Sequence, residues 1–161
     1  MSQVSFENRT VIVTGAGNGL GKAYALDLGS RGAKVVVNDL GGAVDGSGSG
    51  STPADEVVNE IIANGGEAVA NYDSVATKEG GESIVQTAID NFGTVDAVVN
   101  NAGILRDKSF ANMSEEELSL ILDVHLKGTF FVSQPAFKVM KENAYGRIVN
   151  VASPSGLFGN F

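Results

Sequence analysis

The stretch TVIVTGAGNGLGKAYALDLGSRG, residues 10–32, contains three successive patterns that together decide the fold. Its first part, Thr10–Val13, is a run of β-branched residues of the kind found in buried strands. The glycine-rich segment that follows predicts a tight turn, and an amphipathic segment ending at Gly32 predicts a helix. The stretch therefore predicts a strand, a turn and a helix in direct succession.

The same order of strand and helix recurs along the rest of the chain. Further strands are predicted over residues 34–39, 67–73, 96–103 and 147–153, and further helices over residues 52–66, 80–93 and 114–141. Because the strands alternate with helices and are rich in Val and Ile, we expect a parallel sheet covered on both faces. The predicted fold is α/β, a Rossmann-like doubly wound sheet that forms one domain over residues 1–161.

Two segments depart from this regular pattern. The Gly- and Ser-rich segment LGGAVDGSGSGST, Leu40–Thr52, predicts a loop within the domain. Pro135 falls inside the last predicted helix, where its ring should clash with the carbonyl of Phe131. We therefore expect that helix to bend or break at Pro135.

Composition excludes several classes of function. The chain carries 19 acidic and 11 basic residues, a net charge of −8, which argues against nucleic acid or an anionic membrane surface as partner. With no cysteine and one histidine, His125, neither a disulfide nor a metal site is expected. No apolar run is long enough to span a membrane, and the first residues lack a signal-peptide core, so we expect a soluble, cytoplasmic protein.

The glycine turn has the chemistry of a phosphate-binding loop. Lys22 is followed by Ala rather than Ser or Thr, which excludes a P-loop, and Leu20 occupies the third glycine position of the G-x-G-x-x-G pattern. The spacing that fits is G-x-x-x-G-x-G, which would bring backbone N–H groups at a helix start against a pyrophosphate. Alternatively, the glycines only permit a tight turn. The candidate cofactor-binding residues here are Gly15, Asn18, Gly19, Leu20 and Gly21.

Asp39 adds a second feature of a dinucleotide site. It ends the second predicted strand, 24 positions after Gly15, close to the offset at which an acid accepts the ribose hydroxyls. A carboxylate here would repel a 2′-phosphate, and Asn18 stands where a basic residue of the turn could bind one. The pattern favours NAD over NADP. Alternatively, Asp39 is a solvated acid at a strand end.

Together with the motif NNAG, Asn100–Gly103, these residues resemble the short-chain dehydrogenase/reductase family. The resemblance runs from the first strand to Phe161 and implies the N-terminal part of a seven-stranded oxidoreductase fold. The phrases NDLGG, VANYDSV, NNAGILRD, DVHLKG and SPSGLFGNF are similar to the (3R)-hydroxyacyl-CoA dehydrogenase module of type 2 multifunctional enzymes of peroxisomal β-oxidation, and to bacterial relatives.

The resemblance assigns roles to further residues. It implies that Asp73, Ser74 and Val75 contact the adenine, and that Asn101, Ala102 and Gly103 line the adenosine side. The long helix would form a subunit interface, so a homo-oligomer is expected. Ser153 matches the family's catalytic serine, whose hydroxyl binds the substrate oxygen, whereas a serine in this loop could instead only cap a turn.

His125 allows two interpretations. It shares a helix face with apolar neighbours, which predicts a hydrogen-bonded histidine in the core. Most members of the family have an asparagine here that holds a water in the proton path, and a neutral imidazole could hold the same water. The neighbours on this face are Leu118, Ile121, Leu122, Thr129 and Val132.

The family's general base is a tyrosine in a Tyr-x-x-x-Lys motif that follows the serine. The chain ends before such a motif, so we expect a truncated domain without turnover, with the apolar edge IVNVA exposed. The intact enzyme is expected to oxidise a secondary alcohol, a (3R)-3-hydroxyacyl-CoA, with NAD. The alternatives are a steroid or small-alcohol dehydrogenase, a non-catalytic NAD-binding fragment and, for location, the peroxisome.

Overall fold

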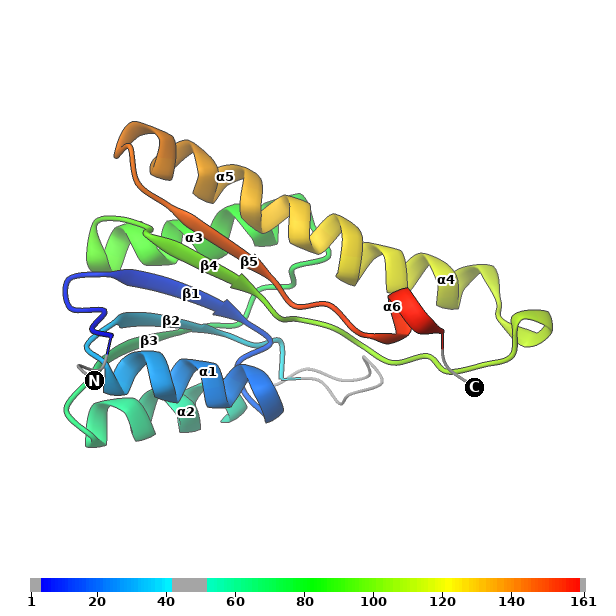
Figure 1. Ribbon diagram of the computed structural model, residues 1–161, viewed down its shortest axis with the longest axis horizontal. Helices are drawn as coiled ribbons and strands as arrows, with labels where there is room; N and C mark the ends of the chain where they lie inside the picture. Colours follow the sequence, from blue (N-terminus) through cyan, green and yellow to red (C-terminus); the bar gives the residue numbers. More distant parts are fainter. Residues whose placement is uncertain (1–3, 42–51, 160–161) are drawn as a thin grey trace.

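Five parallel strands form a single sheet in the order β3-β2-β1-β4-β5 (Figure 1). The computed structural model describes residues 4–41 and 52–159, so most of the loop predicted over Leu40–Thr52 lies outside the described residues. The strands are β1 (Thr10–Thr14), β2 (Lys34–Asn38), β3 (Glu67–Asn71), β4 (Ala97–Asn100) and β5 (Arg147–Asn150). The predicted α/β fold with five parallel strands is confirmed.

Helices cover both faces of the sheet (Figure 1). The helices are α1 (Gly19–Ser30), α2 (Thr52–Ala63), α3 (Lys78–Phe92), α4 (Glu115–Leu122), α5 (Gly128–Glu142) and α6 (Ser155–Phe158), with a 3₁₀ turn η1 (Phe110–Asn112) and a π-helical turn η2 (Asp123–Lys127). Successive strand residues point to opposite faces, so Val11 and Val13 join the core under α1 and α2 while Ile12 joins the core under α3 and α5. All three side chains are buried.

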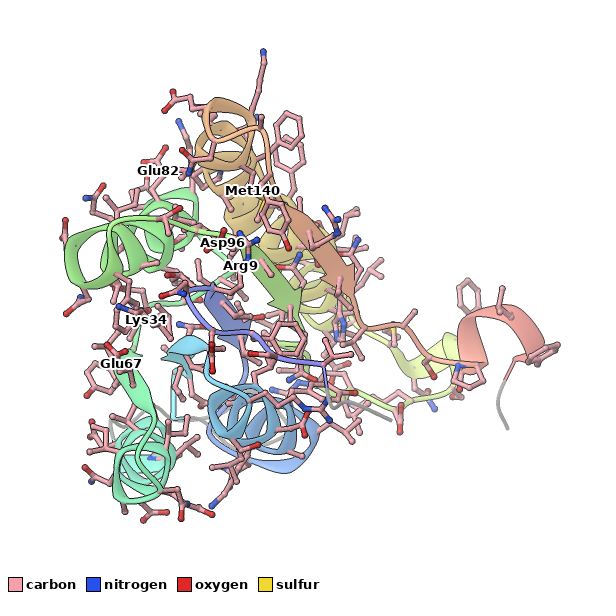
Figure 2. All side chains as sticks on the ribbon, turned by 60° about the vertical axis from the view of Figure 1, so that its left-hand side comes forward. Arg9, Lys34, Glu67, Glu82, Asp96 and Met140 are labelled. Atoms are coloured by element: carbon pink, nitrogen blue, oxygen red, sulfur yellow. The ribbon has the colours of Figure 1, made fainter. Side chains whose placement is uncertain are left out.

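The amino-terminal and carboxyl-terminal ends of the strands carry different kinds of side chain. At the amino-terminal edge, acidic and basic side chains pair across neighbouring strands, as the labelled Arg9 and Asp96 show (Figure 2). An Arg9 guanidinium nitrogen lies 3.0 Å from an Asp96 carboxylate oxygen, and the other oxygen accepts from the Thr10 N–H. At the carboxyl-terminal edge, each strand instead ends on an uncharged polar residue.

β5 forms an edge of the sheet, and all four of its residues are exposed. It pairs only with β4 among the described residues, in the register Ala97↔Arg147 to Asn100↔Asn150. Ile148 and Val149 are 38% and 50% exposed, so the expected exposure of this apolar edge is confirmed.

The long helix predicted over residues 114–141 consists of α4, the π turn η2 and α5. Ser114 and Glu117 form a capping box at its start. The expected break at Pro135 is wrong, because α5 continues through this residue. Pro135 removes the helical donor for the Phe131 carbonyl, but this oxygen packs against Gly81 of α3, where an added Cβ would lie only 2.4 Å away. Tertiary packing at a glycine thus accommodates the proline.

Candidate cofactor-binding and active site

A cavity of about 480 Å³ opens at the carboxyl ends of the strands. It is lined by all twelve predicted cofactor-binding residues and by four others, namely Gly15, Asn18, Gly19, Leu20, Gly21, Asn38, Asp39, Leu40, Asp73, Ser74, Val75, Asn101, Ala102, Gly103, Ile104 and Val124. These residues come from segments far apart in the sequence, which β1, β2, β3 and β4 bring together. In doubly wound sheets, ligands bind at this edge.

The glycine turn needs glycine at three positions. Gly15 and Gly19 have φ values of +61° and +55°, in the left-handed region that favours glycine. At Gly21 an added Cβ would lie 2.1 Å from the Gly15 carbonyl oxygen, so no side chain fits there. α1 begins at Gly19 with no acidic residue in its first turn, which leaves the positive end of the helix available to an anion.

Asp39 is held by two backbone donors. Its Oδ2 accepts from the Gly17 N–H and its Oδ1 from the Gly41 N–H, both at 2.7 Å. A Cβ at Gly17 would lie 2.8 Å from the Asp39 Cγ, so the carboxylate packs directly against the glycine turn. A carboxylate in this position accepts hydrogen bonds from hydroxyl groups and repels phosphate. No lysine or arginine lines the cavity as described, so nothing there offsets that repulsion.

The segment after β3 forms another part of the cavity wall. Asp73 Oδ2 accepts from the Asn71 side-chain amide at 2.9 Å and from the Ser83 hydroxyl at 2.7 Å. The hydrogen bonds of this carboxylate within the described chain use Oδ2 alone. Ser74 and Val75 complete this wall, and Val75 also packs in the core beneath it.

Hydrogen bonds connect the NNAG motif, at the end of β4, to the end of β1 and to the glycine turn that follows it. The Asn101 side-chain amide donates to the carbonyl oxygens of Thr14 and Gly15, both at 3.0 Å. The Thr14 hydroxyl accepts from the backbone N–H groups of Asn101 and Ala102 at 3.1 Å. These bonds fix the glycine turn relative to the end of β4.

His125 lies in the π turn η2 and is exposed in the described chain, so the expectation of a core histidine is wrong. Its Nε2 lies 2.9 Å from the Ile104 carbonyl oxygen and 3.1 Å from the Ile104 backbone nitrogen. One tautomer can donate to the carbonyl, and the other can accept from the N–H. The ring also covers Gly103, where a Cβ would lie 2.7 Å from the imidazole Cε1. His125 therefore supports two residues that line the cavity.

Ser153 does not line the cavity. It is exposed in the segment between β5 and α6, and its hydroxyl accepts from the Ser155 N–H at 3.2 Å, which is the bonding of a serine that caps a turn. None of the three tyrosines lines the cavity either. Tyr72 donates to Asp55, and this hydrogen bond raises the pKa of the phenol.

Within residues 4–41 and 52–159, no three side chains of His, Asp or Glu come together in a way that could hold a metal ion. In the same residues, no helix combines the length and the apolar character that a membrane span requires.

Four residues line the cavity without having been predicted: Asn38, Leu40, Ile104 and Val124. Asn38 had a usable signal, since it is a polar residue at the end of the valine run of β2. Ile104 and Val124 are ordinary apolar residues whose place depends on the loop after β4 and on the π turn. No local pattern identifies either of them.

Comparison with known proteins gives a family match over nearly the whole chain. The family model for short chain dehydrogenases matches residues 9–161. The chain is 60% identical over 158 residues to the peroxisomal hydratase-dehydrogenase-epimerase of Saccharomyces cerevisiae, covering 98% of this chain and 17% of the relative. It is 56% identical over 160 residues to the peroxisomal multifunctional enzyme type 2 of Mus musculus, covering 99% and 21%.

A solved structure extends the comparison to three dimensions. The structure of 7α-hydroxysteroid dehydrogenase complexed with NADH and 7-oxo glycochenodeoxycholic acid superimposes with a TM-score of 0.88 at 29% identity. The match covers 98% of this chain and 58% of that one. The chain thus spans about a fifth of the length of the two peroxisomal relatives and somewhat over half of the solved dehydrogenase.

Proposed function

Because the chain belongs to the short-chain dehydrogenase family, we propose that it supplies the cofactor site of an NAD-dependent oxidoreductase that oxidises a secondary alcohol to a ketone. The family and the likeness to type 2 multifunctional enzymes, both predicted from motifs, are confirmed. The observation that carries the proposal is that the glycine turn, Asp39 and residues 101–103 of the NNAG motif line the same cavity. We assign residues 1–161 to one NAD-binding domain.

The residues of the cavity divide the dinucleotide between them. The glycine turn binds the pyrophosphate through backbone N–H groups, which only glycine lets approach closely. Asp39 accepts the ribose hydroxyls, Asp73 to Val75 contact the adenine, and Asn101 to Gly103 line the adenosine side. Bound NAD would accept the hydride from the alcohol carbon.

The preference for NAD over NADP rests on Asp39. We expect the dissociation constant of NADP to exceed that of NAD at least about tenfold, and we expect Asp39→Ala to narrow this gap, because the variant lacks the charge that repels a 2′-phosphate. Titration calorimetry with both cofactors measures the ratio. Asp90→Ala is the control, since it removes one negative charge from an exposed site on α3. Equal affinities in the parent protein would contradict the assignment.

For the chemical step, we assign Ser153 to bind the substrate oxygen and His125 to hold a water near the reacting centre. The contact of His125 with Ile104, which lines the cavity, supports its role. In the full-length protein, Ser153→Ala should lower kcat and leave the NAD dissociation constant unchanged, because Ser153 lies outside the cavity. His125→Asn should retain activity that His125→Leu loses, whereas equal activity of these two variants would remove His125 from the mechanism.

The substrate we propose is a (3R)-3-hydroxyacyl-CoA. Two relatives support this choice. The chain is 60% identical to a peroxisomal hydratase-dehydrogenase-epimerase and 56% identical to a peroxisomal multifunctional enzyme type 2. A steroid alcohol is the second candidate, because the solved dehydrogenase of the same fold is named for a hydroxysteroid. A panel of (3R)-3-hydroxyacyl-CoA, steroid and small alcohols separates the two, and indifference to the CoA thioester would exclude the first. Binding of NAD without turnover of any alcohol by the full-length protein would leave only a nucleotide-binding role.

We also propose a surface for self-association and a location in the cell. The outer face of α4, η2 and α5 exposes Leu118, Leu122, Leu126, Phe130 and Phe137. We assign this face to contact with a second copy, because exposed apolar faces of this kind mark interfaces. Sedimentation of a Phe130→Ser variant tests it, and an unchanged mass would exclude this face. The names of the two relatives favour the peroxisome over the cytoplasm, which microscopy of a fluorescent fusion decides.

A further inference from the structure

A row of uncharged polar side chains crosses the whole sheet at its carboxyl end. The register pairs Thr14 with Asn38, Asn38 with Asn71, and Asn100 with Asn150, while the pairing of Val13 with Val99 brings Thr14 next to Asn100. The row is therefore Asn71, Asn38, Thr14, Asn100 and Asn150. All but Asn150 are buried, so their polar atoms require hydrogen-bond partners.

Asn38 is 2% exposed and connects two segments of the cavity wall. Its side-chain amide donates to the Asn71 side-chain oxygen and to the Asp73 carbonyl oxygen, each at 2.9 Å. Asp73 lies beyond the end of β3, so this second bond reaches a residue that has already left the sheet.

Asn71 relays this support to the Asp73 carboxylate. Its side-chain oxygen accepts from the Asp73 N–H at 3.0 Å, and its amide nitrogen donates to Asp73 Oδ2 and to the Thr87 hydroxyl, both at 2.9 Å. The amide of Asn71 is thus oriented from both sides, by Asn38 and by Thr87. The other oxygen of the Asp73 carboxylate, Oδ1, takes no part in these hydrogen bonds.

We propose that Asn38 is a positioning residue for adenine recognition, acting through Asn71 and Asp73. It fixes the Asp73 carboxylate so that Oδ1 can accept a hydrogen bond from the exocyclic amino group of adenine. The inference rests on the proposed function, since it takes the cavity to hold NAD with its adenine beside Asp73. Such preorganisation makes the site selective for a base that can donate at this position.

A purely structural role would not require this arrangement. β2 and β3 are already paired along five residues each, and the three valines of β2 are buried in the core. Asn100 is the matched counterpart on the other side of β1, 7% exposed and in the same row. Its amide donates to Asn150 and Ser133, and neither of these lines the cavity.

The test compares NAD with nicotinamide hypoxanthine dinucleotide, in which a carbonyl oxygen replaces the adenine amino group. We expect the parent protein to bind NAD about tenfold tighter than the analogue, because a carbonyl next to Asp73 leaves two acceptors facing each other. In Asn38→Ala this ratio should fall to about twofold or less. Asn100→Ala removes an equally buried amide and should keep the parent ratio, even if its thermal stability falls by as much.

Thr87→Val supplies a second variant should Asn38→Ala not fold, since it removes only the hydroxyl that orients Asn71 from α3. Thr87→Val should lower the preference for NAD over the hypoxanthine analogue by a factor of about three. An unchanged ratio in either folded variant, with both dinucleotides weakened equally, would overturn the inference and leave the proposed function intact. A fall in Asn100→Ala as large as in Asn38→Ala would also overturn it. A parent protein that binds both dinucleotides equally would refute the Asp73–adenine contact itself.

Discussion

The two halves of the sheet differ in how well their side chains are buried. The valines of β1 and β2 are buried, and the segments after β1, β2 and β3 line the cavity together with the segment after β4. Beyond β4, all residues of β5 are exposed, and Leu157 and Phe158 of α6 are 82% and 85% exposed. The first half is thus stabilised by its own contacts and supplies most of the residues that line the cavity. The second half presents exposed apolar side chains.

Stability should differ most between the two halves. Ile12 of β1 is fully buried, whereas Ile148 of β5 is 38% exposed. We expect Ile12→Ala to lower the free energy of unfolding by about 4 kcal/mol, and Ile148→Ala by about 1 kcal/mol, because only the first leaves a closed cavity in a packed core. Urea denaturation of both variants measures the difference. Equal losses would mean that the edge strand is as well packed as the central one.

Cofactor binding should respond to glycine substitution in the turn after β1 but not in α6. Gly21→Ala places a Cβ 2.1 Å from the Gly15 carbonyl oxygen and should weaken NAD binding about 100-fold, because the turn must open. Gly156→Ala, in α6, meets no atom within 4 Å and should change the dissociation constant less than about twofold. Fluorescence titration with NADH compares them. Comparable losses would show that α6 contributes to the cofactor site.

The smallest expected effects are on the pH dependence of stability. The hydrogen bond from Tyr72 to Asp55 raises the pKa of the phenol, so this stabilisation is present below about pH 10 and is lost as the pH rises through the folded-state pKa. In the second half, hydrogen bonds from Lys108 and from the Ser114 backbone lower the pKa of Glu117, so its contribution is lost as the pH falls through the folded-state value.

Thermal unfolding between pH 3 and pH 11 separates these two contributions. Tyr72→Phe should flatten the alkaline limb of the stability profile and leave the acid limb unchanged, while Glu117→Gln should do the reverse. The effects are small because water reaches both groups, with Tyr72 43% exposed and the Glu117 side chain 21% exposed. A change in the same limb for both variants would contradict the assignment of either pKa shift.

Sequence reasoning succeeded where a local pattern determines local structure. The valine runs and the glycine turn predicted the sheet and the turn after β1, and the family resemblance implied the other predicted residues that line the cavity. It failed where a distant segment decides the outcome. Pro135 does not break α5 because Gly81, on another helix, accommodates the Phe131 carbonyl. The π turn that brings His125 to Ile104 has no periodicity of its own, and Asn38 acquires its role only through Asn71 and Asp73.

The strand order also has a consequence for the protein during its synthesis. β1 pairs with β2, which follows after a short interval, and with β4, which begins 83 residues after β1 ends, at Ala97. At ribosomal rates this second interval lasts on the order of 10 s. The first three strands can associate as soon as β3 has emerged, so the nascent chain then carries β1 with one edge unpaired. Chaperones that shield exposed strand edges should therefore bind this chain before residue 97 is translated and release it afterwards.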